Sequence, residues 1–252
     1  YGTMEFYQLC KKHNMHPIIG LEVDSVYKEE PFHFILLAKN DRGLQNLYRL
    51  TSIIKESIAF EEVVNYATDC VVLTSSDGKD MFSAYIEHQD LEKLNAFVEL
   101  CKNSFSDFYV SVSMNDSGKK RVDNKILKQL DCKRVAISRI LYENSEDVKT
   151  LQVLRAIAKQ SNIENQGLDV QFQRYLKSPQ EMEALYDESD LLATEEIAGM
   201  CNVQMAFQKS KLPVFKNKLH IDSRDYLIKL CKKGLEKRLN GNRNATYMNR
   251  LE

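Results

Sequence analysis

The sequence predicts an α/β fold in which a mostly parallel sheet or βα barrel is followed by an all-helical segment. Three observations support this prediction. The chain has 252 residues, of which 43% are hydrophobic, enough to bury a core. Strand-like and helix-like patterns alternate through the first two-thirds of the chain, as they do in βαβ units. Beyond about residue 145 only helical patterns remain.

Five apolar runs rich in β-branched or aromatic residues are the expected strands. The run at residues 35–38 is apolar without alternation, which is typical of a strand that is covered on both faces of a parallel sheet. The expected strands are residues 17–23, 32–37, 71–74, 108–112 and 134–138.

Helical patterns lie between these runs and continue beyond them. Leu91, Leu94 and Val98 recur at helical spacing after Asp90, a suitable N-cap. Ser178, followed by Pro179 and an acidic residue at position 181, predicts a helix start. The expected helices are residues 4–12, 43–56, 91–102, 124–130, 147–159, 188–201 and 223–239, with a further one that begins at 179.

The composition is typical of a soluble globular protein. There are 35 Lys and Arg against 36 Asp and Glu, and no apolar run reaches the roughly 18 residues of a membrane span. We therefore expect a soluble, cytoplasmic protein without a signal peptide. The six cysteines lie at least 30 positions apart, which predicts scattered reduced thiols rather than disulfides or a zinc site.

Charge is unevenly distributed along the chain. Residues 209–250 contain twelve Lys and Arg but three Asp and Glu, a net charge of +9, so the remainder carries −10. Candidate DNA-binding residues in the last expected helix are Lys232, Lys233, Lys237 and Arg238. They either contact phosphate groups or form the solvated face of an amphipathic helix, and composition alone favours the solvated face.

The usual catalytic motifs are missing from the sequence. There is no Gly-rich dinucleotide-binding or P-loop fingerprint, no G-x-S-x-G and no H-E-x-x-H. Glu22 and His33 are expected near strand ends, from which they could reach a common site. One His and one Glu are too few for a catalytic metal, which needs about three protein ligands. Spacing alone therefore identifies no catalytic centre.

Four ordered blocks resemble the bacterial replicative DNA polymerase III alpha subunit, and specifically its polymerase and histidinol phosphatase (PHP) domain. They are YGTMEFYQLCKKHNMHPIIGLE at 1–22, HFILLAKN with GLQNL at 33–47, YLKSPQEM at 175–182, and Leu212-Pro213 with the run at 226–235. No single block is decisive, but four in the same order are hard to obtain by chance. The likeness extends over nearly the whole chain and is strongest in the first 50 residues and in 175–240.

The resemblance implies a PHP-type distorted, TIM-like βα barrel, followed by helices that lead toward the palm. Residues 1–208 would be the PHP domain with its C-terminal helices, and residues 209–252 a basic helical segment at the start of the palm. Family members begin with an H-x-H strand and an Asp-His pair before the Tyr-Gly, so we expect a PHP domain truncated at its N-terminus.

The resemblance also implies a degenerate metal site. Glu22 matches an acidic ligand of the family, whereas Ser76, Asn115, Arg139 and Leu141 occupy the positions of its Cys, its His and its closing D-x-H. Losing that many ligands abolishes a multinuclear site. We therefore expect no metal and no catalytic residue in this chain, and an ion pair between Arg139 and Glu22 in place of the metal. The PHP domain would then be a structural scaffold without proofreading.

As a function, the resemblance implies the N-terminal part of a replicative DNA-directed DNA polymerase. The family's catalytic carboxylates lie in the palm, beyond Glu252, so this part alone is expected to be inactive and to hold no cofactor. The parent chain would use Mg²⁺, primer–template DNA, deoxynucleotides and other replisome subunits such as the sliding clamp, with no membrane contact.

Two alternatives remain open at this point. One is a free-standing, metal-dependent PHP phosphoesterase similar to histidinol-phosphate phosphatase. The missing ligands and the basic helical extension argue against it. The other is a non-catalytic interaction module of the replisome, which the sequence does not distinguish from a scaffold.

Overall fold

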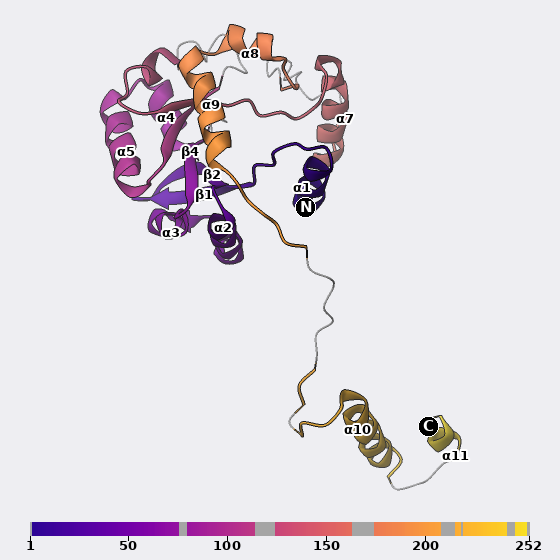
Figure 1. Cartoon of the computed structure of the whole chain (residues 1–252). Helices are drawn as coiled ribbons and strands as arrows, with labels where there is room; N and C mark the ends of the chain where they lie inside the picture. Colours follow the sequence, from indigo (N-terminus) through magenta and orange to yellow (C-terminus); the bar gives the residue numbers. More distant parts are fainter. Residues whose placement is uncertain are drawn as a thin grey trace. The chain divides into compact units, whose positions relative to one another are not determined.

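The computed structural model describes residues 2–75, 80–113, 124–162, 174–207, 215–217, 219–240 and 245–250. They belong to two units, Tyr1–Met205 and Ala206–Glu252, and each unit is described by itself. Figure 1 shows the elements of both. None of the helices in these ranges is long and apolar enough to cross a membrane.

A mixed sheet forms the centre of the first unit (Figure 1). Its order is β3-β1-β2-β4-β5-β6. The strands are β1 (Gly20–Tyr27), β2 (Glu30–Ala38), β3 (Ile58–Ala59), β4 (Cys70–Thr74), β5 (Phe108–Val112) and β6 (Arg134–Ala136). β2 is antiparallel to both β1 and β4, whereas the other pairs are parallel. The α/β class is confirmed and is consistent with a PHP-type fold. The described strands form an open sheet of mixed direction, whereas a mostly parallel sheet or a distorted βα barrel was expected.

A tight hairpin between β1 and β2 causes this difference. Tyr27 pairs with Glu30, so Lys28 and Glu29 alone make the turn. Both have positive φ, 50° and 69°, as a type I′ hairpin turn requires. Such turns usually contain Asn-Gly or Asp-Gly, and Lys-Glu carries no such signal. The reversal of β2 along β1 was therefore not predictable from the residues of the turn.

Helices cover the two faces of the sheet. On one face lie α2 (Asp41–Ile53), α3 (Phe60–Tyr66), α4 (Met81–Glu87) and α5 (Leu91–Ser104). On the other lies α9 (Glu188–Met200). The remaining helices of this unit are α1 (Thr3–Lys12), the short 3₁₀ turn η1 (Ser145–Asp147), α7 (Val148–Ala158) and α8 (Pro179–Leu185), and residues 124–127 are also helical.

Capping signals in the sequence locate α5 and α8. Asp90 caps α5 by accepting from Lys93 N at 3.1 Å. Ser178 and Glu181 form the capping box of α8, whose first residue is Pro179, as predicted. Sequence analysis missed β3, α3 and α4. Each is at most seven residues long, too short for a periodic pattern to stand out.

A cluster of phenylalanine rings fills the larger core. Phe34 in β2 has no exposed surface, and the rings of Phe60, Phe97 and Phe105 lie 5.8–6.1 Å from its own. Phe32 stacks on Phe97 with 4.3 Å between ring centroids. These are favourable separations for aromatic pairs. Because Phe32 and Phe34 both point to this face of β2, the strand shares one core with α2, α3, α4 and α5.

The segment after α9 is fastened beside α1 and α2. The hydroxyl of Tyr7 in α1 donates to Val203 O at 3.4 Å and accepts from Met205 N at 3.1 Å. His16 contacts the carbonyl of Cys201. Asn202 N donates to Lys39 O at 2.8 Å. The end of the first unit is therefore held by residues from near its beginning.

The second unit contains α10 (Ser223–Arg238) and α11 (Ala245–Asn249). The basic helix expected at 223–239 is confirmed in α10, which begins after Asp222. The side chain of Asp222 accepts from Arg224 N at 2.8 Å. Lys237 and Arg238 lie in the last turn, where cations favour the helix dipole.

A buried ion network holds α9 against the edge strand β6. Arg134 in β6 is 13% exposed, and its Nη2 atom lies 2.9 Å from Asp190 Oδ1 and 3.2 Å from Asp187 Oδ2. Lys128 Nζ lies 2.6 Å from the same Asp187 oxygen. The hydrogen bond from Lys128 holds the pKa of Asp187 below its usual range, whereas burial raises the pKa of Asp190. Arg134 is therefore the counter-charge that lets Asp190 be buried.

Replacing Arg134 tests this network. We expect Arg134→Met to lower the free energy of unfolding by about 3–5 kcal/mol, because it leaves a buried carboxylate without its partner. The neighbouring Lys133 is a matched control. Its side chain is 63% exposed and pairs with Glu196 at 3.0 Å, so Lys133→Met should cost about 1 kcal/mol or less. Urea unfolding followed by circular dichroism measures both, and equal losses would contradict the role of Arg134.

Candidate functional site

A polar cluster lies on the face of β1 and β2 that is opposite the phenylalanine core. Glu22 and Asp24 are two residues apart in β1, so their side chains share one face, while Val23 between them is buried in the core. The strand register places His33 of β2 directly opposite Asp24. The structure thus brings together the predicted Glu22 and His33, and it adds Asp24. The two-residue spacing from Glu22 was the signal by which the sequence could have identified it.

His33 lies between the two carboxylates. Its Nδ1 atom is 2.6 Å from Asp24 Oδ1, and its Nε2 atom is 3.7 Å from Glu22 Oε2. Its backbone is fixed as well, because His33 N donates to Asp80 Oδ2 at 3.2 Å. Asp80 is buried and also caps α4 through Ser83 N at 3.1 Å. The imidazole is therefore positioned by both its strand and its neighbours.

Arg139 joins the cluster from the segment that follows β6. Its Nη2 atom lies 3.5 Å from Glu22 Oε2, so the ion pair expected from the sequence is present. In the sheet, β2, β4 and β5 separate β1 from β6, and the pair therefore links segments that are not adjacent strands. Both side chains are nearly half exposed, 45% and 46%. An exposed pair of this kind contributes about 0–1 kcal/mol to the stability of the fold. Its main effect is to place a positive charge beside the carboxylate of Glu22.

The described residues of this cluster do not fit a resident metal ion. Within those ranges, no group of three or more His, Cys, Asp or Glu is placed to hold one. His33 Nδ1 is engaged by Asp24, and the guanidinium of Arg139 puts a fixed positive charge beside Glu22. This guanidinium would repel a metal cation that approached the carboxylate of Glu22.

The other predicted positions of the degenerate site have different outcomes. Ser76 and Asn115 lie outside the described residues. Leu141 offers no ligand atom from its side chain, and its main-chain N donates to Arg174 O at 2.8 Å. The neighbouring Tyr142 forms a bridge with Tyr175. The segment around Leu141 thus pairs with the chain before α8, and the absence of a metal site stays a prediction.

The buried thiols are poor candidates for a nucleophile. Burial raises the pKa of Cys70 to about 12 and that of Cys201 to about 11. A thiol is reactive as the thiolate, and these two stay protonated at neutral pH.

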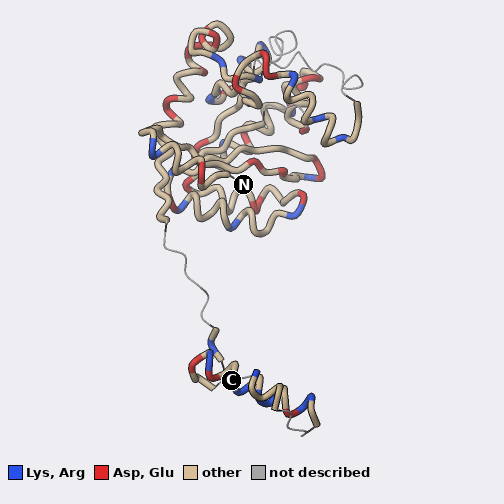
Figure 2. Tube along the Cα trace, turned by 90° about the vertical axis from the view of Figure 1, so that its right-hand side faces the viewer, with Lys and Arg blue, Asp and Glu red and all other residues tan. Residues whose placement is uncertain are grey.

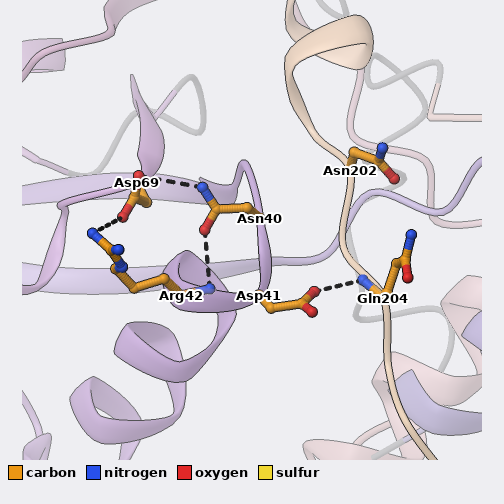
Figure 3. A pocket seen from close by; sticks show the side chains of 6 residues that line it. All are labelled: Asn40, Asp41, Arg42, Asp69, Asn202 and Gln204. Carbon is orange, nitrogen blue, oxygen red and sulfur yellow. Dashed lines mark hydrogen bonds and ion pairs between the residues drawn. The ribbon is translucent and has the colours of Figure 1, made fainter.

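A polar pocket of about 410 Å³ opens at the start of α2 (Figure 3). Its lining residues are Asn40, Asp41, Arg42, Asp69, Asn202 and Gln204. Figure 3 shows hydrogen bonds or ion pairs among all of these residues except Asn202. Arg42 Nη1 lies 3.5 Å from Asp69 Oδ2, Asn40 Nδ2 donates to Asp69 Oδ1 at 3.2 Å, and Gln204 N donates to Asp41 Oδ1 at 2.7 Å.

The same region contains an unusually close backbone contact. A Cβ atom on Gly43 would lie 2.3 Å from Asp69 O. The side chain of Asn40 caps the helix through Gly43 N at 3.1 Å, and Asn46 Nδ2 donates to Thr68 O at 3.0 Å. Asn40, Gly43 and Asn46 belong to the block HFILLAKN–GLQNL. This block is therefore explained by the packing of α2 against the loop before β4, without a catalytic role.

A second hollow of about 560 Å³ lies between β6 and α9. Its lining residues are Tyr109, Cys132, Lys133, Arg134, Ser189, Asp190, Leu192, Ala193 and Glu196. The charged groups pair within the hollow, Lys133 with Glu196 and Arg134 with Asp190. The hollow thus coincides with the ion network that holds α9, which gives its charges a structural role.

The candidate DNA-binding residues all lie on α10, but on different faces. With 3.6 residues per turn, Lys233 and Lys237 are about 40° apart around the helix axis. Lys232 is about 100° from Lys233, and Arg238 about 100° from Lys237. All four are exposed. Figure 2 shows Lys and Arg along this helix.

Substituting Gly43 tests the close contact at α2. We expect Gly43→Ala to lower the free energy of unfolding by about 1–3 kcal/mol, because the backbone carbonyl of Asp69 must shift to admit a methyl group. In the control Gly199→Ala, in α9, nothing lies within 4 Å of the new Cβ. That change should raise stability by about 0.5–1 kcal/mol. If the two substitutions have the same effect in urea unfolding, the contact does not constrain the fold.

Comparison with known proteins agrees with the resemblance. Residues 1–115 match the PHP domain family. The chain is 28% identical to the DNA polymerase III subunit alpha of Halalkalibacterium halodurans, over 94% of this chain and 22% of that protein. Identity to the same subunit of Bacillus subtilis is 26%, over 100% of this chain and 24% of the relative. Identity to the DNA polymerase III subunit alpha of Campylobacter jejuni is 26%, over 100% of this chain and 26% of that protein.

The chain therefore spans about a quarter or less of the length of these relatives. The four ordered blocks and the overall identity both indicate the same region of DNA polymerase III alpha subunits. A free-standing PHP phosphoesterase is not favoured. The chain contains a PHP domain and is homologous to the N-terminal region of bacterial DNA polymerase III alpha subunits.

Proposed function

We propose that the first unit is a structural PHP scaffold of a replicative DNA polymerase, with no metal-dependent chemistry of its own. The observation that carries this proposal is the guanidinium of Arg139, 3.5 Å from Glu22. A PHP phosphoesterase needs cations at this position to bind and polarise a phosphate group. Here a side chain supplies a fixed positive charge that cannot activate water.

The polymerase activity is proposed for the longer protein to which this region belongs. That protein would extend a primer on a DNA template with deoxynucleotides and Mg²⁺, alongside other replisome subunits such as the sliding clamp, in the cytoplasm. Phosphoryl transfer needs carboxylates that hold two metal ions. We therefore propose that the carboxylates of the active centre belong to the longer protein and not to this region.

We further propose that α10 contacts DNA phosphates through Lys232, Lys233, Lys237 and Arg238. Residues 206–252 contain twelve Lys and Arg against four Asp and Glu, a net charge of +8, whereas residues 1–205 carry −9. A local positive charge of this size attracts polyanions. The net charge of the whole chain is only −1, because the charges of the two units nearly cancel.

An activity assay tests the scaffold proposal. The 252-residue chain is incubated with p-nitrophenyl phosphate, or with a single strand labelled for 3′-end removal, in the presence of Zn²⁺, Mn²⁺ or Fe²⁺. We expect rates equal to those of buffer. Metal-dependent hydrolysis that disappears in Glu22→Gln would show that the cluster is a working active site and would overturn the proposal. Glu183→Gln, an exposed acid on α8, is the matched control.

A further inference from the structure

The rings of exposed Phe215 and half-buried Tyr226 pack together beside the first turn of α10. The rings of Phe215 and Tyr226 are 5.8 Å apart between centroids, at an angle of 38°. Phe215 is 62% exposed. Burial of such a ring against the protein would be favourable by a few kcal/mol, so its exposure leaves an apolar surface open for a ligand.

Hydrogen bonds fix the backbone that carries this ring. Ser223 Oγ donates to Phe215 O at 3.2 Å, which ties the residue to the first turn of α10. Asn217 is buried, its Nδ2 donates to Ile221 O at 2.7 Å, and its Oδ1 accepts from Leu219 N at 3.1 Å. The turn is therefore built around Asn217, and Phe215 is held in place before any ligand arrives.

Three lysines share the face of α10 on which Tyr226 lies. Lys229, Lys233 and Lys237 follow Tyr226 at intervals of three or four residues, so the four side chains fall within an arc of about 80°. The lysines are exposed. We call Phe215, Tyr226, Lys229, Lys233 and Lys237 the stacking face.

The two acids of α10 lie beside this face and not within it. Asp225 and Glu236 are about 60–80° from its centre, on the side of Lys232. Glu236 is four residues from Lys232 and three from Lys233, and Asp225 is four from Lys229, so the acids offset part of the positive charge on their side of the helix. The arc of the stacking face itself contains three lysines and no acid, and it also carries the ring of Tyr226.

We infer that the stacking face binds single-stranded DNA, with its lysines on successive phosphates and a base stacked on Phe215. The inference rests on the proposed phosphate contacts of α10 and names the form of DNA that they take. Aromatic side chains interleaved with basic ones are the combination that single-strand-binding surfaces use, because unpaired bases expose their π-faces. In a duplex those faces are covered by neighbouring base pairs. Lysines that contact the phosphates would then be enough for binding, and an exposed aromatic ring would add nothing.

Fluorescence anisotropy with the 252-residue chain tests this assignment. The probes are a labelled single strand, the corresponding duplex and a single strand of abasic sites. We expect Phe215→Leu to weaken binding to the intact single strand about tenfold and to leave the abasic strand and the duplex unchanged. Phe6→Leu, at an exposed ring in α1, is the matched control and should change nothing.

A second variant separates this inference from the phosphate contacts beneath it. Lys233→Gln/Lys237→Gln should weaken all three probes and reduce the salt slope for the single strand by about 1.4, whereas Lys149→Gln, exposed on α7, should not. If the lysine variant weakens binding but Phe215→Leu does not, base stacking is wrong and the phosphate contact stands. If the lysine variant has no effect either, the proposed DNA contact of α10 is wrong as well.

Discussion

The register of β1 against β2 is the constraint on which both the core and the polar cluster depend. Because side chains alternate along a strand, a slip of one residue would carry Glu22 and Asp24 into the phenylalanine core and bring Val23 out of it. The two-residue turn at Lys28 and Glu29 sets this register locally. The rings around Phe34 then hold it, since they pack only when β2 presents its aromatic side to the helices.

Burial distinguishes two of the arginines that pair with carboxylates, Arg134 and Arg139. Arg134 is nearly buried, and its role is to make the burial of Asp190 tolerable. Arg139 is half exposed and adds little stability, but it provides a permanent cation where a metal-dependent PHP enzyme would bind metal ions. The first arrangement stabilises the fold, whereas the second places a cation beside Glu22 without adding much stability. The proposed scaffold role rests on this contrast between the two arginines.

Several elements were predictable because their signals are local. β5 is observed at the residues expected, and Ser178 begins α8 as its capping box indicated. The hairpin was not predictable, because its turn residues carry no glycine or asparagine. Of the candidate site, the pairing of Arg139 with Glu22 followed from family positions. Asp24 shares a strand face with Glu22 by its spacing, but its pairing with His33 required the strand register, and Asp80 became visible only through the cap of α4. The aromatic pair at Phe215 depends on a turn held by Asn217, and composition alone does not reveal such a contact.

The most direct test of the scaffold role is the metal content of the purified 252-residue chain after equilibration with Zn²⁺, Mn²⁺ and Fe²⁺ and removal of free metal. Elemental mass spectrometry should find metal well below one equivalent, because Arg139 occupies the surroundings of Glu22 and the described acids and histidines form no ligand set. One or more equivalents, lost in Glu22→Gln, would show that the cluster binds metal and would contradict the scaffold role.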